Sequence, residues 1–152
     1  MFAWLVARCR EWMSELSGDA FSIEEATVYD KLIAMGLQKL NTSMRFCPTM
    51  NGERSAPDHG GSINDIRLHN GSLGDLSASL ARGLIGNLIE MLPAELQSRL
   101  RSSSVIGTGN ALLRNAILQH FLREALGESV QLHLQEATDA AVGAAIAPLI
   151  VA

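Results

Sequence analysis

The chain has 152 residues, of which 47% are hydrophobic and 18% are charged, and its net charge is −4. This length and composition are typical of one folded globular domain, and no apolar run approaches the roughly twenty residues of a membrane span. The 12 basic residues are scattered, which argues against nucleic acid as a partner. Two distant cysteines, Cys9 and Cys47, predict free thiols in a reducing compartment and hence a cytoplasmic protein.

The first forty residues have the spacing of two amphipathic helices. Apolar residues recur at helical intervals over residues 2–16, and Gly18 follows as a stop signal. A second helix is expected to begin near Ser22, whose hydroxyl could form a capping box with Glu25, and to end near Asn41.

The middle of the chain changes from turn-rich to helical. The stretch "MRFCPTMNGERSAPDHGGSINDIRLHNGS" is rich in glycine and proline and predicts a strand, a long hairpin-like loop and a second strand. From Ser72 to Leu92, leucines then repeat every three or four residues. Ser72 and Asp75 have the spacing of a capping box, so a helix is expected to begin there.

The last third predicts alternating strands and helices. A short buried strand "SSVIG" and a loop precede a helix over residues 116–126, which Gly127 closes. An alternating strand "SVQLHL" and a helix of small residues, "TDAAVGAAIAPLIV", follow. This order predicts an α/β layer with largely parallel strand pairing.

The loop in "VIGTGNALLRN" has the composition of a phosphate site. Gly107, Thr108 and Gly109 follow a strand and precede a helix, so backbone amides there could point at phosphate oxygens. A P-loop would need a lysine beside a serine or threonine, and the dinucleotide motif would need a small residue in place of Leu112. From its pattern alone, the loop is equally consistent with a nucleotide site and with a plain turn.

Other polar residues have simpler structural explanations. The side chain of Asn115 can cap the helix that starts at Ala116, and the four histidines lack the spacing of metal ligands. Asp58 and His59 lack the motif of a serine hydrolase and are expected to be solvated loop residues. Glu53 and Arg54 could face a ligand but are expected to anchor their loop as an ion pair.

Four segments nevertheless match a known family in order and spacing: "PTMNGERSAPD", "SLGDLSASLARGLIGNLIEMLP", "VIGTGNALLRNAILQHFLREALG" and "TDAAVGAAIAPL". The chain resembles the C-terminal part of the FGGY carbohydrate kinases, and most closely those members that act on a heptulose. Residues 1–152 would then be a partial C-terminal domain, with the fold of an actin-like, ribonuclease H-like ATPase lobe.

The resemblance also implies ligands and site residues. Gly107, Thr108 and Gly109 would line the phosphates and ribose of ATP, and Asn110 and Asn115 would lie near the adenine. Magnesium would neutralise the phosphate charge, and a heptulose or similar sugar would bind the other lobe. Thr108 replaces the commoner glycine of the family.

The catalytic aspartate of the family belongs to a segment upstream of the matched motifs. This chain alone is therefore expected to lack its catalytic base and to be inactive, so no catalytic residue is assigned. The alternatives are a non-enzymatic remnant that binds nucleotide or a partner, and an unrelated α/β binding domain. Apolar surface exposed in the isolated chain predicts oligomerisation or aggregation.

Overall fold

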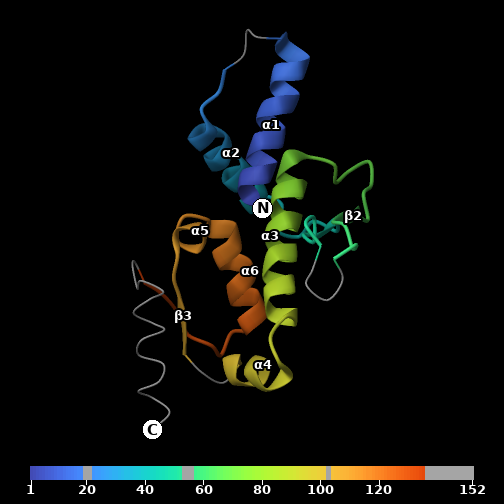
Figure 1. Ribbon diagram of the computed structural model, residues 1–152. Helices are drawn as coiled ribbons and strands as arrows, with labels where there is room; N and C mark the ends of the chain where they lie inside the picture. Colours follow the sequence, from blue (N-terminus) through green and yellow to red (C-terminus); the bar gives the residue numbers. More distant parts are fainter. Residues whose placement is uncertain (19–21, 53–56, 102–103, 136–152) are drawn as a thin grey trace. The chain divides into compact units, whose positions relative to one another are not determined.

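The computed structural model describes residues 1–18, 22–52, 57–101 and 104–135, which belong to two compact units (Figure 1). The N-terminal unit is Met1–Leu92 and the C-terminal unit is Pro93–Ala152. Helices and two small sheets make up the described residues, so the α/β class is confirmed. Within them, every helix is too short or too polar to cross a bilayer.

Three helices and a hairpin form the N-terminal unit. Helix α1 (Phe2–Ser17) packs on α2 (Glu25–Leu37), and the long helix α3 (Leu73–Glu90) packs against α2. The hairpin lies against α3, and the core between these elements includes Leu5, Leu32, Met44 and Leu80, each at most 1% exposed.

The hairpin consists of β1 (Arg45–Cys47) and β2 (Ser62–Asn64), which pair antiparallel with Phe46 opposite Ile63. The predicted strand, loop and strand are therefore confirmed, although each strand has only 3 residues. A side chain at Gly83 of α3 would place its Cβ 2.0 Å from the carbonyl oxygen of Phe46. Glycine at this position lets β1 approach the helix closely.

The start of α2 differs from the prediction. Glu24 occupies the N-cap and makes no side-chain cap hydrogen bond, so the capping box of Ser22 and Glu25 is wrong. Ile23 precedes the cap, and Ile23 and Val28 both line one apolar groove. The two residues have the spacing of a hydrophobic staple. Apolar packing rather than a hydroxyl cap therefore sets where this helix begins, and it ends at Leu37, short of the predicted Asn41.

In the C-terminal unit, β3 (Val105–Gly107) and β4 (Leu132–Leu134) pair in parallel, as predicted. Helix α6 (Ala116–Leu126) follows the one-turn helix α5 (Asn110–Leu113) and has the predicted bounds. Strand β3 is not fully buried, because Ile106 is 60% exposed. The predicted helix over residues 138–151 lies outside the described residues.

The helix α4 (Ala94–Leu100) was not predicted. Pro93 occupies its N-cap, and none of its residues is buried. A helix without a buried face has no apolar stripe to reveal it, which explains why it escaped the hydrophobic pattern.

Candidate functional site

The glycine-containing loop connects the parallel strand β3 to the helical pair α5 and α6. Strand β4 fixes the start of this loop, because the Gln135 amide donates to the carbonyl oxygen of Gly107 at 3.0 Å. On the other side, the carbonyl oxygen of Gly109 accepts from the amides of Leu112 and Leu113 at 3.1 and 3.0 Å. Thr108 lies between these two anchors, Asn110 follows them as the first residue of α5, and both are exposed.

The two glycines of the loop are needed for different reasons. Gly107 is buried, and a Cβ there would lie 2.7 Å from Cδ2 of Leu112 and 3.1 Å from Cδ2 of Leu134. Gly109 has φ 96°, a conformation that residues other than glycine rarely adopt, and no atom lies within 4 Å of the position that a Cβ would take. Gly107 therefore serves packing, whereas Gly109 leaves open space above the backbone.

Asn115 is the most deeply buried polar residue beside the loop, at 0% exposed. Its Oδ1 accepts hydrogen bonds from the amides of Ile117 and Leu118 at 3.1 and 3.2 Å, so the predicted cap of α6 is confirmed. Its Nδ2 is also buried but has no hydrogen-bond partner among the described residues. One half of the side chain thus fixes the helix, and the other half retains an unused donor.

Gln119 also belongs to this arrangement, although no motif singled it out. Its Nε2 donates to the carbonyl oxygens of Leu112 and Leu113, both at 3.0 Å. These bonds tie the end of α5 to α6. The residue lies four positions after the cap Asn115, which places it on the same side of the helix.

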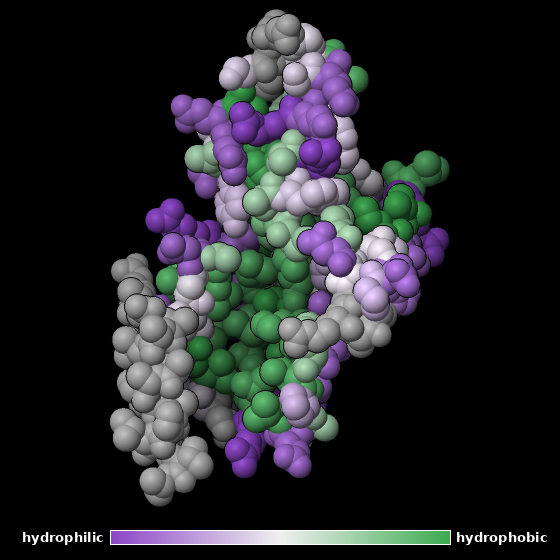
Figure 2. Space-filling view, in the orientation of Figure 1, coloured by the Kyte–Doolittle hydropathy of each residue, from purple (hydrophilic) through white to green (hydrophobic). Residues whose placement is uncertain are grey.

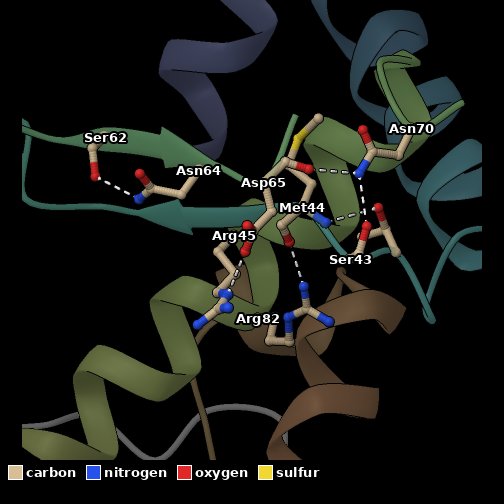
Figure 3. A network of polar contacts seen from close by, with 9 residues as sticks. Ser43, Met44, Arg45, Ser62, Asn64, Asp65, Asn70 and Arg82 are labelled. Carbon is tan, nitrogen blue, oxygen red and sulfur yellow. Dashed lines mark hydrogen bonds and ion pairs between the residues drawn. The ribbon is translucent and has the colours of Figure 1, made fainter. Parts of the chain in front are cut away.

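A second cluster of polar residues lies in the N-terminal unit around the buried Asn70 (Figure 3). Its Nδ2 donates to Oγ of Ser43 and to the carbonyl oxygen of Asp65, both at 2.9 Å, and its Oδ1 accepts from the Arg67 amide at 2.7 Å. Nε of Arg45 lies 2.8 Å from Oδ2 of Asp65. Asn70 therefore holds the loop between β2 and α3 in place.

Asp75 completes the capping box predicted with Ser72, and it is 2% exposed. Burial would raise the pKa of this carboxyl, but hydrogen bonds from Ser72 and Thr42 and the charge of Lys39 lower it overall. Asp75, Thr42 and Lys39 line an open hollow of about 470 Å³. The Asp75 carboxylate already accepts hydrogen bonds from Ser72, the N-cap residue of α3. We therefore interpret Asp75 as a residue that stabilises the start of α3.

The other candidate residues do not join either cluster. Asp58 and His59 are both exposed, in agreement with a solvated loop. Glu53 and Arg54 lie outside the described residues. Within the described part of the chain, no three His, Cys, Asp or Glu side chains come together as metal ligands.

Comparison with known proteins identifies relatives. The chain is 34% identical to the sedoheptulokinases of Homo sapiens and Mus musculus over 139 residues, which are 91% of this chain. The matched region is 28% of the length of either relative. No protein-family model and no solved structure matches the chain. The resemblance in its motifs is therefore confirmed: this chain is similar, over nearly its whole length, to part of sedoheptulokinase.

Proposed function

We propose that this chain is the ATP-binding part of a sedoheptulokinase-like carbohydrate kinase of the FGGY family. The observation that carries the proposal is the 34% identity to two sedoheptulokinases over 91% of the chain. The complete reaction would transfer the γ-phosphoryl group of ATP to sedoheptulose, giving ADP and sedoheptulose 7-phosphate. The fold of the complete lobe would be actin-like, and the protein would be cytoplasmic.

The loop after β3 has features that suit a nucleotide. We assign Gly107, Thr108 and Gly109 to the phosphates and ribose, and Asn110 and Asn115 to the adenine side. The open space at Gly109 would allow a ligand to approach the backbone, where a side chain would obstruct it. The unused Nδ2 of Asn115 is a buried donor that suits an acceptor such as a ring nitrogen.

Magnesium would reach the site with the triphosphate. The described residues contain no cluster of three metal ligands, so phosphate oxygens of ATP and water molecules would supply most of its coordination. When bound, the ion would neutralise charge on the transferring phosphoryl group. The protein residues near the loop would position the nucleotide.

We expect the isolated chain to bind ATP without transferring its phosphoryl group. No aspartate or glutamate occurs between Ser104 and Gln119, so the loop itself supplies no carboxylate base for a sugar hydroxyl. In the family, that base and most sugar contacts belong to another segment. Binding of ATP is therefore the property to measure first.

The test is isothermal titration calorimetry of the 152-residue chain with ATP and Mg²⁺. Gly109→Val should weaken binding at least tenfold, because it closes the open space beside the loop. Gly127→Val is the matched control, since Gly127 has φ 90°, also has open space around it, and ends α6 far along the chain from the loop. The control should bear the same backbone strain and keep its affinity within about twofold.

Two outcomes would overturn the proposal. The first is no heat of binding for the unchanged chain at millimolar ATP. The second is an equal loss of affinity in both variants while each keeps its helical circular dichroism. Binding without any phosphorylation of sedoheptulose is the expected result for this chain alone.

A further inference from the structure

We propose that the N-terminal unit carries a head-to-tail self-association surface, in which an apolar loop tip of one copy enters an apolar groove of a second copy. The loop tip is formed by Ile66 and Leu68, which follow β2. The groove lies between α1 and α2. Both surfaces belong to the same unit, and neither has a role in the nucleotide site proposed above.

The loop tip projects two aliphatic side chains into solvent. Leu68 is 109% exposed and Ile66 is 62% exposed. Figure 2 shows a hydrophobic projection at the right of the molecule, where Figure 1 has the loop between β2 and α3. Exposed aliphatic residues that project together are typical of a contact surface rather than of a solvated loop.

The loop is rigid at its base, which favours binding. The side chain of Asn70 makes three hydrogen bonds, to Ser43, Asp65 and Arg67, and the Asn70 amide donates to the carbonyl oxygen of Arg67 at 3.1 Å. The loop is therefore ordered before any partner arrives. A preorganised apolar tip loses little conformational entropy when it docks.

The groove offers a receptor of matching size and chemistry. It has a volume of about 280 Å³, and all but one of its lining residues are apolar; among them are Trp12, Leu16, Ile23 and Met35. Leu16 is 89% exposed and Trp12 is 43% exposed, so the groove is open to solvent. The remaining lining residue, Lys31, can lay its aliphatic stem along the wall with its charge in water.

Charges beside the two surfaces are complementary. Arg67 lies between the two tip residues, is exposed, and makes no ion pair within the described residues. Glu15 and Glu24 are neighbours in sequence of the groove residues Leu16 and Ile23. Both glutamates are exposed, and neither makes an ion pair with another described residue. Glu15 and Glu24 outnumber Lys31, the basic residue that lines the groove, so the arginine beside the tip suits the charge near the groove, which favours a second copy as the occupant.

In the proposed head-to-tail interface, the tip of one copy enters the groove of the next, whereas reciprocal docking about a two-fold axis would close a dimer. In the head-to-tail arrangement, each copy that docks its tip still presents a free groove, so the assembly grows beyond a dimer. Sedimentation velocity of the full chain should therefore give a weight-average mass that rises with concentration beyond that of a dimer. High salt should weaken the association, since charges contribute to it.

Complementation between two variants is the decisive test. Leu68→Glu removes the tip but keeps the groove, and Leu16→Glu damages the groove but keeps the tip; both positions are exposed, so neither change should unfold the chain. Each variant alone should stay monomeric, and an equimolar mixture should form a one-to-one dimer. Trp12 fluorescence should shift to the blue in the mixture, because Leu68 would cover the groove.

Charge exchange gives an independent measurement. Arg67→Glu should weaken self-association at least tenfold, and combining it with Glu15→Lys and Glu24→Lys should restore most of the loss. Leu88→Glu is the matched control, because Leu88 is 53% exposed and belongs to neither surface. A monomeric unchanged chain at high concentration, equal effects of Leu68→Glu and Leu88→Glu, or two variants that fail to combine would each overturn the proposal.

Discussion

Asn70 and Asn115 are both buried asparagines, 3% and 0% exposed, yet their side-chain amides are used differently. Asn70 accepts one hydrogen bond and donates two, so both ends of its amide are occupied. Asn115 accepts two and its Nδ2 donates none within the described residues. A saturated buried amide is explained by the fold alone, whereas a buried donor without an acceptor requires another explanation.

The difference separates a structural residue from a candidate binding residue. Leaving a buried donor unsatisfied costs about 1–3 kcal/mol, and a ligand acceptor would recover part of that cost. Asn70, in the N-terminal unit, shows that the chain can fully satisfy a buried side-chain amide where that amide only stabilises a loop. Replacing each asparagine by aspartate tests this comparison, because the change keeps the acceptor oxygen and replaces the donor by a second, negatively charged acceptor.

Asn70→Asp should have the largest effect. It would place a carboxylate oxygen opposite the carbonyl oxygen of Asp65, where Nδ2 now donates at 2.9 Å, and should destabilise the N-terminal unit by about 3 kcal/mol. Urea denaturation followed by tryptophan fluorescence measures this unit, because both tryptophans, Trp4 and Trp12, lie in it. Asn64→Asp, at an exposed position in β2, is the control and should change stability little.

Asn115→Asp should cost less stability than Asn70→Asp and should have a clear effect on binding. Aspartate caps helices as well as asparagine does, but its second carboxylate oxygen would be buried at this site without a donor among the described residues, so the change should cost about 1–2 kcal/mol, whereas Asn115→Ala should cost about 1 kcal/mol. Hydrogen exchange at the amides of Ile117 and Leu118 measures the cap directly. ATP affinity should fall in both variants. Unchanged affinity in Asn115→Asp would show that Nδ2 of Asn115 does not contribute to the proposed ATP site.

Local sequence rules predicted what depends on neighbours along the chain. The caps at Ser72 and Asn115 are confirmed, because a cap needs only a side-chain oxygen and the amides that follow it. The start of α2 depends instead on Ile23 packing near Val28, and α4 has no buried face. The capping and hydrophobic patterns of the sequence therefore predicted neither the start of α2 nor the existence of α4. The unused Nδ2 could not be predicted, since it depends on which groups tertiary packing brings nearby.

Ser72→Ala should cost about 1 kcal/mol by removing the cap of α3. The change should also weaken the dependence of stability on pH. The pKa of Asp75 is lower in the folded protein than its ordinary 3.8, so its contribution is complete above that pH and is lost as the pH falls through the folded value. Urea titrations near pH 6 and about pH 3 should differ less in the variant; an unchanged difference would mean that Ser72 does not lower this pKa.

Arg45→Gln should have the smallest effect, although it breaks an ion pair beside Asn70. Nε of Arg45 lies 2.8 Å from Oδ2 of Asp65, but the two side chains are 76% and 37% exposed, so water screens the attraction. We expect a loss below about 0.5 kcal/mol, measured by tryptophan fluorescence in urea. Asp65 has φ 59°, and the bond from Asn70 to its carbonyl oxygen would still hold it there. A loss above about 1 kcal/mol would show that the ion pair, rather than the saturated amide, fixes the loop.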